Sequence, residues 1–340
     1  MKYRSVAELD DALMSTSAPV IEAVRSFRGP VMILGAGGKM GPTLAGLAKR
    51  SLEAAGRSDP VIAVSRFREP DSQRWFHEHG IRTLAADLFD PKAVAALPDT
   101  ETVFYLVGLK FGTAQNPSVT WAANTLIPAS IANRFPRSRI VALSTGNVYP
   151  LVDALGPGAD ETHALTPLGE YPNAAVARER LFEWHSRQNA TPMVLVRLNY
   201  AVDLRYGVLH DIARRIWDGE PVPLATGRFN CIWQGDANAM ILRLAQHAAS
   251  PPLTVNLTGS EALSVRDVAE ALGRLLNREP RFEGTESATA LLSDTRRCRE
   301  LLGPPRVTSQ AMIEAVADWV SNGGPSLDKP THFEVRDGVY

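Results

Sequence analysis

The fold is decided by residues 31–41, Val-Met-Ile-Leu-Gly-Ala-Gly-Gly-Lys-Met-Gly, where an apolar run gives way to glycines spaced three apart. Four consecutive apolar residues, Val31 to Leu34, are typical of a strand buried in a parallel sheet. The glycines permit a tight turn, close approach of the backbone to a pyrophosphate, and close packing of the next helix. The start of that helix offers N–H groups and partial positive charge to an anion. The stretch predicts a dinucleotide site, and the alternative is a glycine turn without a ligand.

Composition excludes several classes of function. The chain of 340 residues is 45% hydrophobic and 21% charged, with a net charge of −1, which gives no basis for a nucleic-acid or anionic-membrane partner. Its two cysteines make neither a disulfide framework nor a metal site. No apolar run reaches the roughly 18 residues that a membrane span needs. The first 30 residues contain Asp10, Asp11 and Glu22 in a helix-like pattern and do not resemble a signal peptide. We therefore expect a cytoplasmic protein that acts on a small molecule.

Strand-like and helix-like segments alternate after the glycine turn. Apolar runs recur at residues 60–64, 81–85, 102–107, 139–143 and 193–198. Helix-like segments lie between most of them, at residues 40–56, 70–79, 91–97, 117–135 and 172–188. This alternation predicts an α/β fold, a doubly wound parallel (Rossmann) sheet with helices on both faces.

The same pattern suggests a division of the chain. Residues 1–28 form a helical extension, and residues 29–200 form the dinucleotide-binding Rossmann domain. Residues 201–330 mainly form a smaller C-terminal α/β substrate lobe, from which one strand and one helix return to the Rossmann domain. Residues 331–340 form a tail.

The end of the second strand indicates which cofactor is bound. A carboxylate at this position selects NAD through the 2′-hydroxyl of the adenosine ribose, but here the chain reads Ser65-Arg66. Both side chains can hydrogen-bond a 2′-phosphate, and Lys39 adds a second positive charge nearby. The residues therefore favour NADP over NAD. The alternative is that Arg66 belongs to a solvated loop.

Two further strand ends carry polar groups toward the expected crevice. Asp87-Leu88 follows the third strand, where a carboxylate can accept from the adenine amino group; the alternative is that Asp87 caps the next helix, although Asp90 is better placed for that. The fourth strand ends in Val107, Gly108 and Lys110. The lysine can reach cofactor phosphates or remain a solvated charge.

Further motifs follow in order: residues 143–149 (Leu-Ser-Thr-Gly-Asn-Val-Tyr), Tyr171 in Glu-Tyr-Pro-Asn-Ala-Ala, residues 197–199 (Arg-Leu-Asn), and Asp236 in Trp-Gln-Gly-Asp. With the glycine turn and Asp87, they make residues 29–320 resemble the extended short-chain dehydrogenase/reductase family, also called the NAD-dependent epimerase/dehydratase family. Residues 108–110 are similar to the same tripeptide in UDP-galactose 4-epimerases, whose lysine touches the cofactor.

The resemblance implies a catalytic set and an assembly. Tyr171 corresponds to the acid/base, Thr145 to the hydroxyl that orients the substrate oxygen, and Asn124 to the helix asparagine. Helices 121–135 and 172–188 match those that pack family homodimers. With the motifs, the expected cofactor contacts are Gly35, Gly37, Gly38, Lys39, Met40, Gly41, Ser65, Arg66, Asp87, Leu88, Val107, Gly108, Lys110, Leu143 and Tyr171.

One family residue is missing. The position four after Tyr171, where the family has a lysine, is Ala175. That lysine lowers the pKa of the tyrosine, and an unassisted tyrosine titrates near pH 10. Three interpretations stay open: another cation such as Lys110 replaces it, the enzyme works in a direction that needs a neutral tyrosine, or the protein binds NAD(P) as a weakly catalytic regulatory or interaction protein.

Five residues are candidate substrate contacts. Asn147 and Asn199 carry amides that both donate and accept. His210 and Arg228 lie in segments that line the family's pocket, although both residue types are often simply on the surface. Trp233 can stack on a sugar or base, although a core position is commoner. We expect an NAD(P)-dependent oxidoreductase or epimerase/dehydratase that acts on a sugar, nucleotide sugar or sugar-derived metabolite, without a metal.

Overall fold

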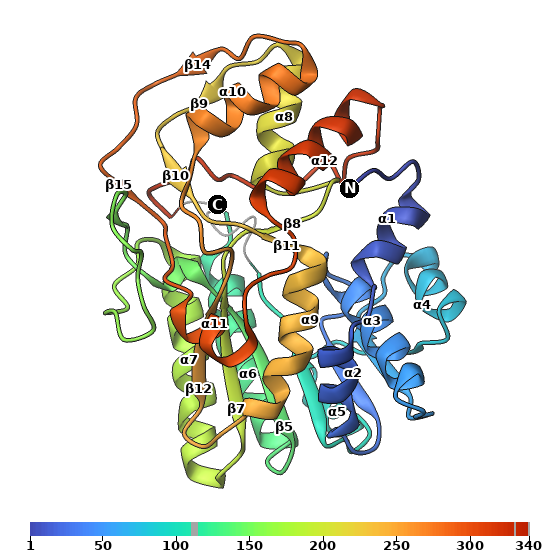
Figure 1. Cartoon of the computed structure of the whole chain (residues 1–340). Helices are drawn as coiled ribbons and strands as arrows, with labels where there is room; N and C mark the ends of the chain where they lie inside the picture. Colours follow the sequence, from blue (N-terminus) through green and yellow to red (C-terminus); the bar gives the residue numbers. More distant parts are fainter. Residues whose placement is uncertain (110–114, 330, 339–340) are drawn as a thin grey trace.

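The central element is a seven-stranded parallel sheet in the order β12-β7-β5-β4-β1-β2-β3 (Figure 1). The structure, a computed structural model, describes residues 1–109, 115–329 and 331–338. The order reverses direction between β1 and β4, which confirms the predicted doubly wound α/β fold and places a crevice there. The strands are β1 (Val31–Leu34), β2 (Val61–Ser65), β3 (Arg82–Ala85), β4 (Thr102–Tyr105), β5 (Arg139–Thr145), β7 (Met193–Leu198) and β12 (Leu253–Leu257).

Helices cover both faces of this sheet because alternate strand residues point to opposite sides. Val31 and Ile33 face the helices α2 (Ala18–Arg25), α3 (Gly41–Ala54), α4 (Arg74–Glu78), α9 (Gln234–Leu244) and α11 (Arg296–Leu302). Met32 and Leu34 face the helices α5 (Pro91–Ala95), α6 (Pro117–Arg134) and α7 (Glu170–Asn189). Both faces are apolar, which explains why these strands read as unbroken apolar runs.

A second core lies beyond the carboxyl ends of the strands. It packs three helices, α8 (Val208–Asp218), α10 (Val265–Leu276) and α12 (Ser309–Ser321), against one another. Short strand pairs complete it or link it to the large sheet: β8 (Ala201–Val202) with β11 (Ile232–Trp233), β9 (Val222–Pro223) with β14 (Phe282–Glu283), β10 (Arg228–Phe229) with β13 (Leu263–Ser264), and β6 (Val152–Asp153) with β15 (Thr289–Ala290).

The first helix, α1 (Val6–Leu13), connects the two cores. Its N-terminus is capped by Ser5, whose hydroxyl accepts from the Glu8 amide. Leu9 and Leu13 are fully buried in the second core, while α2 packs on the sheet. The N-terminal extension is therefore part of the packed fold.

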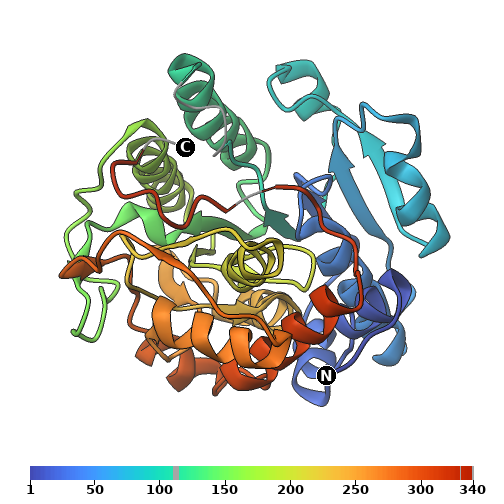
Figure 2. The same ribbon diagram turned by 90° about the horizontal axis from the view of Figure 1, so that it is seen from above.

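The C-terminal segment returns to the sheet after α12. Among the described residues that follow Ser321, none belongs to a helix or strand. The segment crosses over the carboxyl ends of the strands (Figure 2) and places the fully buried Phe333 in the second core. Within the described parts of the chain, no helix combines the length and apolar character needed to cross a bilayer.

Candidate functional site

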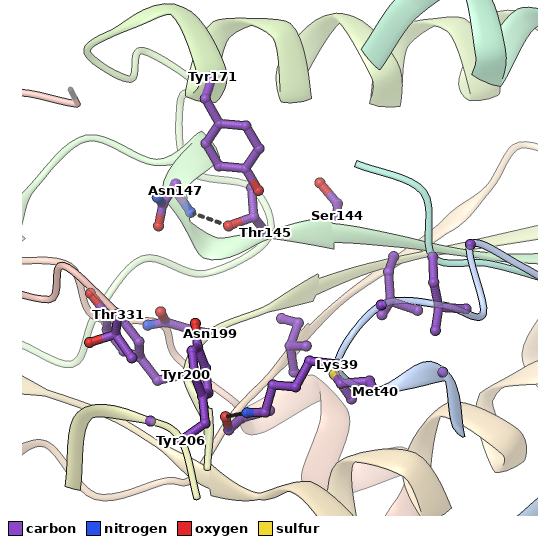
Figure 3. Close-up of a pocket in the computed structure, with 18 residues that line it drawn as sticks. Lys39, Met40, Ser144, Thr145, Asn147, Tyr171, Asn199, Tyr200, Tyr206 and Thr331 are labelled. Atoms are coloured by element: carbon purple, nitrogen blue, oxygen red, sulfur yellow. Dashed lines mark hydrogen bonds between the residues drawn. The ribbon is translucent and has the colours of Figure 1, made fainter. Parts of the chain in front are cut away.

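A cavity of about 280 Å³ opens where the strand order reverses (Figure 3). It is bordered by the glycine turn, the ends of β5 and β7, the start of α7, the residues before α8 and the C-terminal segment. Its polar lining includes Lys39, Ser144, Thr145, Asn147, Tyr171, Asn199, Tyr200, Tyr206 and Thr331. This cavity therefore lies at the crevice that doubly wound sheets use for ligands.

Three glycines of the turn have no free space for a side chain. Gly35 has φ +81°, and a Cβ there would lie 3.0 Å from Val107 at the end of β4. A Cβ on Gly37 would lie 2.6 Å from the Ser65 hydroxyl oxygen, and one on Gly41 would overlap the Ala36 carbonyl. At the start of α3 no side chain caps the helix. These residues fit a dinucleotide, because its pyrophosphate needs close backbone approach and N–H groups without partners.

Tyr171 points its ring and hydroxyl group toward Thr145 in the cavity wall (Figure 3). Tyr171 is in the first turn of α7, after Gly169, whose φ of +89° sets the entry of the chain into the helix. Thr145 ends β5, and its hydroxyl oxygen accepts from the Asn147 amide at 3.1 Å. The structure thus brings Tyr171 together with Thr145 and Asn147, which come from a segment more than 20 residues earlier in the sequence.

A buried ion pair fixes α7 against the sheet. Arg197 of β7 donates to Glu179 of α7 at 2.7 Å and to the Tyr149 hydroxyl at 2.7 Å. Ser144 also donates to Glu179. Burial raises the pKa of Tyr149 to about 12, so its hydroxyl stays protonated and works as a structural hydrogen-bond donor to Asn256. The pair positions the helix that carries Tyr171.

Asn124 lies behind the cavity and not in its wall. It is fully buried in α6, where its amide donates to the Thr120 carbonyl at 2.8 Å. Its side-chain oxygen accepts from Arg178 at 3.0 Å. Ala175, at the position of the family lysine, is buried against Val148 and Tyr149. Lys110, the predicted replacement cation, lies outside the described residues.

The expectation that Lys39 joins Ser65 and Arg66 beside the adenosine ribose is wrong. The Lys39 ammonium donates to the Ala201 carbonyl at 2.7 Å, beyond the end of β7, whereas Ser65 ends β2 on the other side of β1. The lysine turns this way because the Tyr206 ring lies 3.9 Å from its nitrogen. Burial lowers the pKa of Lys39 to about 7.

At the opposite side of β1 the predicted residues lie at the ends of β2 and β3. Ser65 is half-buried and Arg66 is exposed. Asp87 is exposed, and its carboxylate accepts from the Phe89 amide at 3.1 Å. Asp90, not Asp87, caps α5. The side chain of Leu88 is buried under α6, so only its backbone is available to a ligand.

Of the five predicted substrate contacts, the structure brings only Asn147 and Asn199 into the cavity. The other three predicted residues lie outside the lining of this cavity. His210 is 3% exposed and bonds Ser326, because its position on α8 turns it toward the second core. Arg228 donates to the Ala262 carbonyl at 3.2 Å, in the β10–β13 pair. Trp233 is packed within the second core.

Sequence reasoning missed Tyr200, Tyr206 and Thr331 in the cavity wall. Gly207, with φ +122°, starts α8, so the residue before it faces the cavity while the next ones face the core. In the sequence, only that glycine indicates the position of Tyr206. Burial raises the pKa of Tyr206 to about 12. Nothing in the sequence indicates that Thr331 returns to the site.

Comparison with known proteins agrees with this geometry. The sequence model of the NAD-dependent epimerase/dehydratase family matches residues 31–258. A search of curated proteins found no significant match.

Solved structures share the fold at low sequence identity. UDP-glucuronic acid 4-epimerase from Bacillus cereus, in complex with NAD, is 16% identical with a TM-score of 0.71, over 86% of this chain and 96% of its own. UDP-glucose 4-epimerase from Thermotoga maritima, with UDP-glucose, is 16% identical with a TM-score of 0.70, over 86% of this chain and 99% of its own. A short-chain dehydrogenase/reductase superfamily protein from Agrobacterium tumefaciens, with bound NAD, is 19% identical with a TM-score of 0.68, over 85% of this chain and 96% of its own. The family match covers most of the chain, and the chain therefore belongs to the NAD-dependent epimerase/dehydratase family.

Proposed function

We propose that this protein transfers a hydride between bound NAD(P) and a hydroxyl or carbonyl carbon of a sugar, and that the sugar is carried on a nucleotide. The observation that carries the proposal is that Tyr171, directed toward Thr145, lines with it a cavity that also borders the glycine turn. The solved structures of similar fold that hold UDP-glucose or NAD support the substrate and cofactor classes.

Each side chain has a role that its chemistry permits. Tyr171 moves the proton: it takes the proton from a substrate hydroxyl during oxidation and returns it to the carbonyl oxygen during reduction. Thr145 donates to the same oxygen and fixes its position, while the Asn147 backbone amide holds the Thr145 hydroxyl. Asn199, anchored at 3.4 Å to Asn230, offers its amide to sugar hydroxyls. The cofactor, when bound, supplies the hydride acceptor or donor.

The glycine turn and four strand ends would hold the cofactor. Backbone groups of residues 35–41 would meet the pyrophosphate, and Val107 and Gly108 would border the nicotinamide ribose. Asp87 would accept from the adenine amino group. Ser65 and Arg66 support NADP as the preferred form, because no carboxylate stands at the tip of β2. Lys110 remains a prediction for cofactor contact.

The same opening step serves oxidation, epimerisation and dehydration, because each begins by making a keto sugar. The experiment is conversion of a panel of UDP-sugars in the presence of NAD or NADP, with product analysis by chromatography. We expect turnover by the wild type and a loss of at least ~100-fold in Tyr171→Phe. Thr145→Ala, which removes only the orienting hydroxyl, should lose less.

The competing function is a cofactor-binding regulator that has lost catalysis, which Ala175 in place of lysine favours. It predicts tight NAD(P) binding with equal residual rates in the wild type and Tyr171→Phe. That result would overturn the proposed enzyme function.

A further inference from the structure

Arg178 occupies the face of α7 that carries Tyr171 and the alanine in place of the family lysine. Tyr171, Ala175 and Arg178 are spaced by four and three residues, and residues at this spacing lie above one another on a helix. Long side chains on a helix point back toward its N-terminus. The Arg178 side chain is therefore directed toward the turn where the lysine would stand, and Ala174 and Ala175 leave it room.

The partners of Arg178 are neutral. Its Nη1 donates to the Asn124 side-chain oxygen at 3.0 Å and to the Val107 carbonyl at 3.2 Å. The residue is 3% exposed, and its Nε is buried without a hydrogen-bond partner in the described part of the chain. No ion pair of Arg178 occurs among the described residues. Arg197 of β7 is instead paired with Glu179, the neighbour of Arg178 on α7, at 2.7 Å.

This leaves a permanent positive charge in the interior, since a guanidinium does not lose its proton in proteins. Burying a charge without an acid partner costs free energy. The fold accepts this cost directly behind the end of β4.

The Arg178 guanidinium lies next to the backbone that is predicted to hold the cofactor. A Cβ added to Gly108 would lie 2.9 Å from Nη1 of Arg178, so the guanidinium lies directly against the Gly108 backbone. Val107, whose carbonyl accepts from Arg178, is in turn packed against Gly35 of the glycine turn. The charge thus lies one residue layer behind the predicted nicotinamide ribose site.

We propose that Arg178 is a positioning residue that supplies, from seven residues after Tyr171, the positive charge absent at Ala175. It holds Asn124 and the end of β4, and its field acts on the nicotinamide end of the crevice. The inference rests on the proposed function to the extent that it requires a bound dinucleotide. It does not require the substrate to be known.

The positive charge of Arg178 affects the two redox forms of the cofactor differently, which its hydrogen bonds do not do. The oxidised nicotinamide ring carries a positive charge and the reduced ring carries none. A fixed positive charge nearby therefore weakens binding of the oxidised form relative to the reduced form, which makes the bound oxidised cofactor a better hydride acceptor.

The test measures the dissociation constants of NAD+ and NADH, or of the NADP pair, by calorimetry on the full chain. Arg178→Gln keeps a donor near Asn124 but removes the charge, and Arg178→Met removes both. Each should shift the ratio of the two constants by about three- to tenfold in favour of the oxidised form. Arg178→Lys should keep the wild-type ratio. Arg180→Met is the matched control, because Arg180 is on the same helix, 64% exposed and paired with Glu183.

The outcomes separate the two proposals. Equal weakening of both cofactor forms in Arg178→Gln and Arg178→Met, with an unchanged ratio, would overturn this inference alone and leave Arg178 a structural residue. If the wild type binds neither form, the proposed function falls, and this inference falls with it. Thermal unfolding of each variant identifies any that does not fold, and either charge-removing variant is sufficient for the comparison.

Discussion

The ammonium nitrogen of Lys39 lies 3.9 Å from the centre of the Tyr206 ring and donates a 2.7 Å hydrogen bond to the Ala201 carbonyl. A residue of the glycine turn thereby contacts the segment that leads into the second core. The charges around it are Asp203, which is paired with Arg205 at 2.7 Å, and Asp211. Burial outweighs them and lowers the pKa of Lys39 to about 7.

Lys39 should make stability depend on pH. An unfolded lysine titrates near pH 10.4, so the folded state, with its lower pKa, binds fewer protons between about pH 7 and 10. The free-energy cost of burying the charged Lys39 is fully present below about pH 7, and it is relieved as pH rises toward 10. Urea unfolding should therefore show the wild type gaining stability relative to Lys39→Met across this window.

Lys49→Met is the control for this prediction, because Lys49 is a partly exposed lysine paired with Glu53 at 3.0 Å. Its unfolding free energy should run parallel to that of the wild type. A parallel curve for Lys39→Met as well would show that Lys39 keeps an ordinary lysine pKa.

Arg66 should decide between the two cofactors. Its side chain is exposed at the tip of β2, where a 2′-phosphate would be neutralised by a guanidinium. Arg66→Ala should raise the dissociation constant of NADP by about tenfold, as expected for one charge-assisted contact, and leave that of NAD within twofold. Arg68→Ala is the neighbouring control. Wild-type binding of NAD that is tighter than that of NADP would contradict the preference.

The sheet was predictable because both of its faces are covered. A strand buried on two sides must be apolar throughout, so β1, β4 and β7 stand out in the sequence. The bounds of helix α9 are hard to predict because polar residues occupy its buried face: Gln234 and Asn238 both donate to the Thr43 hydroxyl, at 3.0 and 2.9 Å. Such buried amides hide the apolar stripe on which a helix prediction depends.

The site was predictable where one motif carries several residues. Thr145 and Asn147 come from one short segment, and Tyr171 has a distinctive local sequence. His210 lies outside the cavity lining because helical register, which a single sequence does not fix, decides whether a residue faces the cavity or the core. The sequence analysis did not consider Arg178, although an arginine at a buried position of a helix is rare and indicates a specific role.

The C-terminal segment should be held over the cavity by Thr331. Its backbone amide and hydroxyl donate to one oxygen of Asp211, at 2.8 and 2.5 Å. Thr331→Ala removes one of these hydrogen bonds, which lowers the free energy of opening of the segment by about 1 kcal/mol. Hydrogen–deuterium exchange of residues 331–338 should then become about fivefold faster, while β1 stays protected.

Ser321→Ala is the control for the C-terminal segment, because the Ser321 hydroxyl donates within α12, to the Asp318 carbonyl at 3.2 Å. Unchanged exchange in Thr331→Ala would show that other contacts, such as Phe333 in the second core, hold the segment alone.

We propose that the outer faces of α6 and α7 form a homodimer interface. These neighbouring helices expose Trp121, Leu126 and Trp184, at 37%, 63% and 56%. The double variant Leu126→Glu/Trp184→Glu should convert a dimer into a monomer in light scattering, because it buries charge at an apolar contact. Leu275→Glu, at a residue 48% exposed on α10, should leave the dimer intact. A monomeric wild type would contradict the proposal.

The central claim, that Tyr171 assists hydride transfer to a bound nicotinamide, is tested most directly by a half-reaction. Stopped-flow absorbance follows reduction of the cofactor when the chain, loaded with NAD or NADP, is mixed with UDP-sugars. The account predicts a reduction phase in the wild type that slows by at least ~100-fold in Tyr171→Phe, with cofactor affinity unchanged. A phase of equal rate in both proteins, or none in either despite bound cofactor and substrate, would contradict it.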